Sequence, residues 1–154
     1  MSGQSLPLET DLPDAEATEA LGARLASLLR PGDLVLLEGP LGAGKTTLVR
    51  GLVAALGGDA AEVCSPTFVL LETYAVRTGS IRRVHHADLY RLRAVAAAPL
   101  DEVGLGECLD DPDAVTAIEW PESWPWLPGL ATRVVRVRLT HLGEARHAEV
   151  AAQG

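Results

Sequence analysis

The feature that most constrains this chain is an uninterrupted glycine-rich segment, residues 39–46, which reads GPLGAGKT. It matches the pattern G-x-x-x-x-G-K-[ST], in which glycines let the loop curl so that backbone N–H groups point at phosphate oxygens. An aliphatic stretch typical of a buried strand precedes it at residues 34–38, and a helical pattern follows at residues 45–56. The sequence therefore predicts a strand–loop–helix unit that binds phosphate, to which the N-terminus of the helix contributes its positive dipole end.

The side chains of this P-loop, or Walker A segment, have distinct expected roles. Lys45 would neutralise charge on the β- and γ-phosphates, Thr46 would offer its hydroxyl to Mg²⁺, and Thr47 would support the helix side of the loop. Lys45 is the single lysine beside twelve arginines, which fits a site for a compact ammonium rather than a planar guanidinium. The expected nucleotide-binding positions of the segment are Gly39, Leu41, Gly42, Ala43, Gly44, Lys45, Thr46 and Thr47.

The base of the nucleotide is assigned by elimination. Proteins specific for GTP usually read guanine with an Asn-Lys-x-Asp segment. This chain contains no asparagine and no lysine besides Lys45, so that segment cannot exist here. We therefore expect ATP as the bound nucleotide.

Acidic partners for the P-loop are expected at the ends of neighbouring strands, where a carboxylate can hold Mg²⁺ and orient the nucleophile. Asp88 ends a strand predicted at residues 81–87, and Glu119 ends one predicted at residues 114–118. Because such ends gather at the edge of the sheet where ligands bind, we favour a functional role over loop capping for both. Thr67 is a third candidate, as a switch threonine that senses the γ-phosphate or as an ordinary turn residue, and its spacing leaves both open.

The remaining patterns predict an α/β fold around this unit. They indicate a strand or arm within residues 1–13, a helix at 14–29, a hairpin of strands 68–76 and 81–89, a short helix and loop at 94–111, a Pro-Trp loop at 120–128, and a second hairpin of strands 133–139 and 147–151. No repeat or long linker divides the chain. We expect residues 1–154 to form a single P-loop NTPase domain, an α/β sandwich with a mainly parallel central sheet and antiparallel hairpin additions.

Composition weighs against several classes of protein. The net charge of −8 argues against tight independent binding to nucleic acid. Cys64 and Cys108 stand far apart without paired histidines, so a metal cluster or disulfide framework is not expected and both thiols should be buried. The apolar runs are too short to span a bilayer, and no signal-peptide pattern occurs, so we expect a cytoplasmic protein without membrane contacts.

Taken together, the motifs resemble those of the TsaE family, the ATPase component of the bacterial machinery that makes threonylcarbamoyladenosine on tRNA. The matching segments, in order and spacing, are GPLGAGKTT at 39–47, SPTF at 65–68, HADLYRL at 86–92 and EWPE at 119–122. The first of these is shared by very many proteins, whereas the other three are much more specific. The resemblance spans most of the chain, from about residue 14 to residue 121.

The resemblance implies roles for individual residues. Thr46 and Glu119 would hold Mg²⁺, with Asp88 completing the metal or water shell and Thr67 acting as the switch threonine. Trp120 would support the site.

It also implies that Thr18, on the first predicted helix, lies near the nucleotide. Ala87 stands where the family often has an aromatic residue, which alters packing behind Asp88 but removes no catalytic group. The implied partners are the threonylcarbamoyl transferase subunit and its non-catalytic paralogue, with tRNA reached only through that complex. ATP hydrolysis would reset the complex, and the chain alone would be a weak ATPase.

Two other functions stay open at this point. A small-molecule or nucleotide kinase would need an acceptor pocket and commonly an arginine-bearing lid. Residues 94–111 are few and contain no arginine, which weighs against such a lid. A nucleotide-gated binding module without meaningful hydrolysis is the other alternative, and the presence of Asp88 and Glu119 argues against it.

Overall fold

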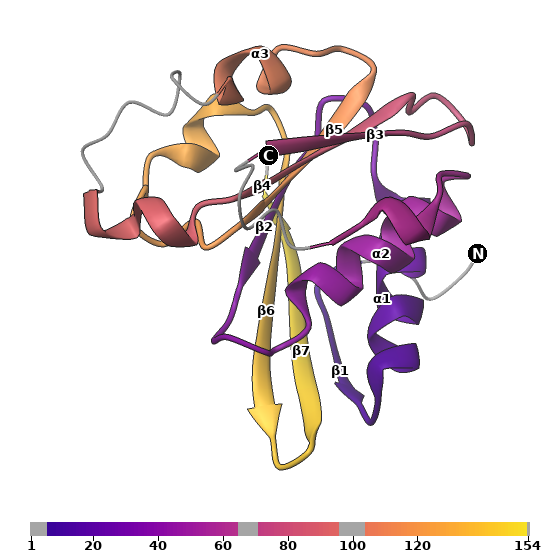
Figure 1. Cartoon of the computed structure of the whole chain (residues 1–154), viewed down its shortest axis with the longest axis vertical. Coiled ribbons are helices and arrows are strands. Elements are labelled where there is room, and N and C mark those ends of the chain that lie inside the picture. Colours follow the sequence, from indigo (N-terminus) through magenta and orange to yellow (C-terminus); the bar gives the residue numbers. More distant parts are fainter. Residues whose placement is uncertain (1–5, 65–70, 96–103, 154) are drawn as a thin grey trace.

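The computed structural model describes residues 6–64, 71–95 and 104–153 and is built on one mixed sheet (Figure 1). Seven strands lie in the order β1-β7-β6-β2-β5-β4-β3. The four inner strands run parallel to one another: β6 (Val134–Leu142), β2 (Leu34–Glu38), β5 (Ala114–Glu119) and β4 (Arg83–Asp88). The outer strands are antiparallel to their neighbours: β3 (Leu71–Ala75), β7 (Ala145–Gln153) and β1 (Leu8–Leu12). The predicted α/β fold, with a parallel centre and antiparallel additions, is confirmed.

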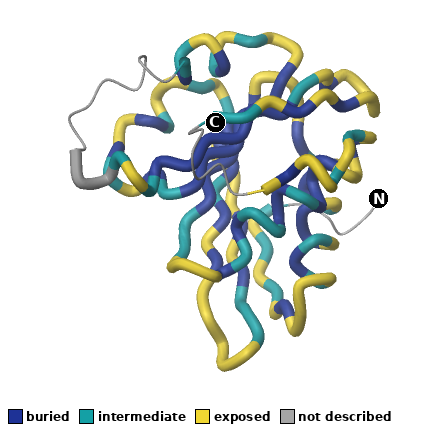
Figure 2. The backbone as a smooth tube through the Cα atoms, viewed as in Figure 1, coloured by how far each residue is buried: buried dark blue, intermediate teal, exposed yellow. Residues whose placement is uncertain are grey.

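Both faces of the central strands are covered. Alternate residues of β2 face opposite sides, so that Val35 and Leu37 pack with α1 (Ala15–Leu28) and α2 (Lys45–Ala55). Leu34 and Leu36 pack on the other side with residues of α3 (Leu105–Leu109) and of the short 3₁₀ segment Leu127–Leu130. Two further 3₁₀ segments are Ala60–Glu62 and Tyr90–Val95. Figure 2 shows the buried residues concentrated along these central strands.

The two long helices begin and end where the sequence predicts. Asp14 caps α1 by accepting a hydrogen bond from the backbone N–H of Ala17 at 2.9 Å. Gly44, at a φ of 103° that favours glycine, opens α2, and Gly57 follows its end at a φ of 87°. The first turn of α2 is thereby fixed beside the ends of the parallel strands.

Strand β1 joins the sheet at its outer edge through β7. His147 of β7 contacts two acids of β1, with Nδ1 2.7 Å from Asp11 Oδ1 and Nε2 3.1 Å from Glu9 Oε1. These hydrogen bonds to carboxylates raise the pKa of His147. The contact adds side-chain hydrogen bonds to the five residue pairs that join the two strands.

Two local predictions are wrong. Cys64 is exposed rather than buried, because Val63 takes the buried position at the end of the Ala60–Glu62 turn; Cys108 is buried as expected. The C-terminal hairpin is longer than predicted, because β6 and β7 pair from Val134↔Gln153 to Leu142↔Ala145.

Within the described ranges, no helix has the length and apolar character needed to cross a membrane. The predicted strand at residues 68–76 is found from Leu71 onward, and its first residues lie outside the described part.

The close approach of α1 and α2 generates a stability prediction. A Cβ atom at Gly51 would lie 2.0 Å from the carbonyl oxygen of Glu19, so Gly51→Ala must push the helices apart. We expect a net loss of about 2 kcal/mol in the free energy of unfolding, larger than the helix propensity gained by alanine. Urea unfolding measures it, and Gly129→Ala, where no atom lies within 4 Å, is the control. Equal stability of both variants would contradict this packing.

Candidate functional site

The glycine-rich loop leaves the end of β2 and enters α2 at the edge of the sheet where β2, β4 and β5 all end. Gly39 turns the chain at a φ of 150°, and a Cβ atom there would lie 2.5 Å from the carbonyl oxygen of Leu139 in β6. Space as well as backbone conformation therefore requires glycine at this position. Leu41, at the apex of the loop, is 62% exposed.

Lys45 is buried at the first position of α2, with 5% of its surface exposed. Its Nζ donates hydrogen bonds to the loop's own carbonyl oxygens, those of Gly39 and of Pro40, the latter at 3.3 Å. The ammonium also lies 3.7 Å from the centroid of the Trp120 ring, in a cation–π contact. Burial lowers the pKa of Lys45, and nearby carboxylates, led by Glu119, oppose this shift.

The two predicted carboxylates lie side by side at the strand ends. Asp88 and Glu119 are register partners at the last positions of β4 and β5, and both are buried. Thr46 donates its hydroxyl to Glu119 Oε2 at 2.9 Å. Asp88 Oδ1 accepts from the backbone N–H of Tyr90 at 2.9 Å, so this carboxylate also caps the turn that follows β4.

His86 is a member of this cluster to which the sequence analysis assigned no role. It is fully buried, with Nε2 2.6 Å from Glu119 Oε2 and Nδ1 3.0 Å from the hydroxyl of Tyr74. Burial raises the pKa of Tyr74 to about 12, so its hydroxyl stays protonated and can donate to Nδ1. When Nδ1 accepts from Tyr74, the N–H of Nε2 donates to the Glu119 carboxylate, and both contacts are satisfied. The signal in the sequence is spacing: His86 stands two residues before Asp88, on the same face of one strand.

Trp120 reaches Lys45 because the backbone turns sharply after β5. It has a φ of 63°, uncommon for a residue other than glycine, and its N–H donates to the Leu37 carbonyl at 3.3 Å. Its ring meets that of Tyr90 edge to face, with 4.8 Å between centroids. The strained conformation thus places the ring over the ammonium. Of the other tryptophans, Trp124 is buried in the core, whereas Trp126 is half exposed.

A second side of the loop faces α1. A hollow of about 130 Å³ lies there, and the predicted residues Thr18 and Thr47 both line it. Thr18 is buried and packs close to the loop. A Cβ atom added at Gly44 would lie only 3.3 Å from the methyl group of Thr18. The loop residues on the hollow are Gly42, Ala43 and Gly44, and Glu144 and Arg146 line it from the C-terminal hairpin.

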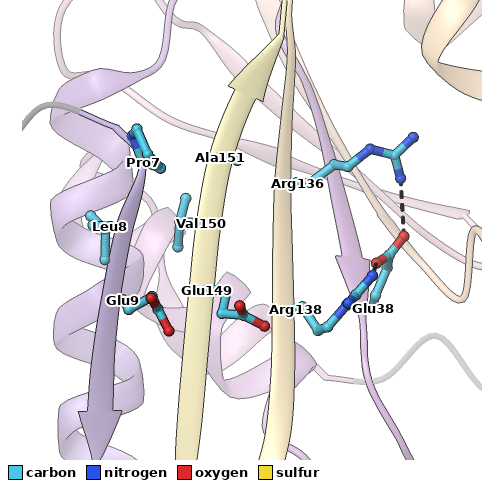
Figure 3. A pocket seen from close by; sticks show the side chains of 9 residues that line it. All are labelled: Pro7, Leu8, Glu9, Glu38, Arg136, Arg138, Glu149, Val150 and Ala151. Atoms are coloured by element: carbon cyan, nitrogen blue, oxygen red, sulfur yellow. Dashed lines mark hydrogen bonds and ion pairs between the residues drawn. The ribbon is translucent and has the colours of Figure 1, made fainter.

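Glu38, the residue before the loop, is held by two arginines of β6. Its carboxylate accepts from Arg136 at 3.0 Å and from Arg138 at 3.3 Å. Figure 3 shows these residues in a groove of about 270 Å³ that runs over β1, β7 and β6. Glu9 and Glu149 also line it, whereas none of the predicted site residues does.

The structure thus gathers most of the predicted residues at one edge of the sheet. Around the start of α2 it brings together Lys45, Thr46, Asp88, Glu119 and Trp120. Thr18 and Thr47 lie across the loop, and Thr67 is outside the described residues. Fold and loop define the class of protein: an α/β protein with a P-loop and two acidic strand ends beside it.

The family follows from comparison with known proteins. The family model described as "Threonylcarbamoyl adenosine biosynthesis protein TsaE" matches residues 12–148. The chain belongs to the TsaE family, as the motifs indicated.

Similar proteins and one solved structure agree with this assignment. A Synechocystis protein named "tRNA threonylcarbamoyladenosine biosynthesis protein TsaE" is 43% identical over 121 residues, 79% of this chain and 74% of the relative. A protein of the same name from Rickettsia bellii is 36% identical over 141 residues, 92% of each chain. The crystal structure of YdiB from Bacillus subtilis superposes with a TM-score of 0.66 at 25% identity, covering 95% of this chain and 86% of that one.

The buried contact of His86 generates a second stability prediction. His86→Ala removes the acceptor of the Tyr74 hydroxyl and one of the two donors to Glu119 Oε2, all in the buried interior, so we expect a loss of about 3 kcal/mol in the free energy of unfolding. Tyr74→Phe removes the hydroxyl but leaves the contact between His86 and Glu119 in place, and should cost about 1 kcal/mol. Chemical unfolding of both variants measures the difference. A His86→Ala variant as stable as the wild type would show that the contact does not hold the cluster together.

Proposed function

We propose that this chain binds ATP with Mg²⁺ and hydrolyses it, and that hydrolysis drives or resets the complex that makes threonylcarbamoyladenosine on tRNA. The observation that carries the proposal is the 2.9 Å contact between the hydroxyl of Thr46 and the carboxylate of Glu119, directly beside the buried ammonium of Lys45. A hydroxyl, two carboxylates and an ammonium at the N-terminus of a helix form a set suited to a triphosphate and its metal ion.

The donor set fits Mg²⁺, which prefers hard oxygen ligands and commonly takes one or two carboxylates together with phosphate oxygens. Thr46 and Glu119 are the residues that would hold it, and Asp88 would complete the metal or water shell. When bound, the ion would neutralise charge on the β- and γ-phosphates. The contacts of Glu119 with Thr46 and His86 support its assignment, because they hold the carboxylate in one orientation.

Other side chains of the site would bind the phosphates, the attacking water and the rest of the nucleotide. Lys45 would exchange its two carbonyl partners for phosphate oxygens, because a charge-assisted bond to phosphate is the stronger one. Trp120 would keep the ammonium in place during that exchange through its ring contact. Asp88 would orient the attacking water. Thr18 and Thr47 would contact the nucleotide in the hollow beside the loop.

The proposed partners are the threonylcarbamoyl transferase subunit and its non-catalytic paralogue, as the family's role suggests. With a net charge of −8, the chain would reach tRNA only through that complex. This role assigns it to the cytoplasm, where tRNA is modified.

Nucleotide binding is the first expected outcome of the proposal. Calorimetry should show binding of Mg·ATP in preference to Mg·GTP, and Lys45→Ala should weaken ATP binding by about 100-fold, because it removes a charge-assisted contact. Removing Mg²⁺ with EDTA should also weaken it. Tighter binding of GTP would overturn the preference, and wild-type affinity in Lys45→Ala would overturn the role of the lysine.

Hydrolysis is the second expected outcome. Phosphate release should be slow for the chain alone and rise at least about tenfold with the two partner proteins, because partners can complete such sites. Glu119→Ala and Asp88→Ala should each lower the stimulated rate by about tenfold or more. Asp113→Ala is the matched control, since Asp113 precedes the first residue of β5 and lies at the opposite end of that strand.

Three outcomes would count against this hydrolysis scheme. Fast turnover by the isolated chain that the partners leave unchanged would contradict stimulation. Activation by tRNA alone would point to direct recognition of nucleic acid. Transfer of phosphate to a nucleoside or small metabolite would favour the kinase alternative.

A further inference from the structure

The C-terminal hairpin extends past the sheet and runs alongside the P-loop (Figure 1). Pairing between β2 and β6 ends at Glu38↔Arg138, but β6 continues to Leu142 before the chain turns back into β7. On that side, the residues of β6 beyond Arg138 therefore adjoin the loop that follows β2. The tip of the hairpin, residues 140–144, is exposed (Figure 2).

Two side chains of this hairpin hold carbonyl groups at the apex of the loop. The Nη2 group of Arg146 donates to the carbonyl oxygen of Gly42 at 3.0 Å, across 104 residues of sequence. His141 donates from Nε2 to the carbonyl oxygen of Leu41 at 3.3 Å. The guanidinium of Arg146 is itself anchored, because Nη1 donates to the carbonyl oxygens of Glu144 and Ala145, both at 2.9 Å.

Because the peptide unit is planar and trans, the carbonyl group of one residue and the N–H group of the next residue point in opposite directions. With the carbonyl of Gly42 fixed toward Arg146, the N–H of Ala43 points the opposite way, across the loop, where it meets the Pro40 carbonyl at 3.2 Å. In the same way, the contact between His141 and the Leu41 carbonyl directs the N–H of Gly42 away from His141. The two contacts from the hairpin therefore fix the orientation of two consecutive peptide units at the apex of the loop.

We propose that Arg146, with support from His141, is a positioning residue that keeps the apex of the P-loop ordered before any ligand is present. The loop carbonyls of Gly39 and Pro40 are held from within by Lys45, and those of Leu41 and Gly42 are held from outside by the hairpin. A loop ordered from both sides loses less conformational freedom when phosphate binds. The expected gain in affinity for ATP rests on the proposed function, whereas the ordering of the loop does not.

The ordering is tested without nucleotide. Hydrogen exchange at the Ala43 amide, followed by NMR, should be about tenfold faster in Arg146→Ala than in the wild type. Arg82→Ala is the matched control, because Arg82 also donates to a glycine carbonyl, that of Gly79 at 3.2 Å, but in the hairpin at the opposite end of β4. Equal exchange in the wild type and Arg146→Ala would overturn the inference, even if the chain proves to bind ATP.

The consequence for the ligand is tested by separating affinity from turnover. Arg146→Ala should raise the Kd of Mg·ATP by about tenfold and leave kcat at saturating ATP within about twofold of the wild type. Arg146→Lys keeps the charge but cannot reproduce the planar fork, so it should not restore affinity. Full restoration by lysine would show that charge alone acts, and would overturn the positioning role.

A second variant guards against misfolding. His141→Ala removes an exposed side chain and should leave the melting temperature unchanged while raising the Kd of Mg·ATP by about threefold. If the wild type binds ATP and both Arg146→Ala and His141→Ala bind it with the same Kd, the inference is rejected. The proposed function would then still stand. Loss of kcat without a change in Kd would also reject the inference.

Discussion

The ammonium group of Lys45 is the charge around which the site is arranged. A buried cation is costly unless its hydrogen bonds and countercharges are supplied, and each neighbour of Lys45 supplies part of them. The loop gives the carbonyls of Gly39 and Pro40, Trp120 gives the face of its ring, and the acids at the ends of β4 and β5 give negative potential. Burial lowers the pKa of the lysine and the carboxylates oppose that shift, so the loop, the turn after β5 and the strand ends depend on one another.

The parallel centre of the sheet is what allows this arrangement. Because β2, β4 and β5 end at one edge, a loop, two carboxylates and a tryptophan from distant parts of the sequence meet without a long connection. A second layer then fixes the first: His86 and Tyr74 hold Glu119, and the arginines of β6 hold Glu38 before the loop. The antiparallel hairpin, which carries no recognisable motif, adds the outer support of the loop.

The features that could be predicted from the sequence are those marked by residues close together in it. The P-loop, the cap at Asp14 and the strand ends at Asp88 and Glu119 are marked by residues adjacent in sequence, and the structure has these elements where predicted. The contacts of His86 depend on the register of β3 with β4 and of β4 with β5, which no local pattern fixes. The contact of Arg146 with the loop joins segments about one hundred residues apart through a strand longer than its alternating pattern suggested.

The central claim, that the loop and the two strand ends form one site for ATP and its metal ion, is tested most directly by a crystal structure with Mg²⁺ and a non-hydrolysable ATP analogue. We expect the β- and γ-phosphates to lie inside the loop and the metal ion to be bound by Thr46 beside Glu119 and Asp88. Lys45 should have moved from the carbonyls of Gly39 and Pro40 onto phosphate oxygens. A triphosphate seated outside the loop, with Lys45 still bonded to its own carbonyls, would contradict the claim.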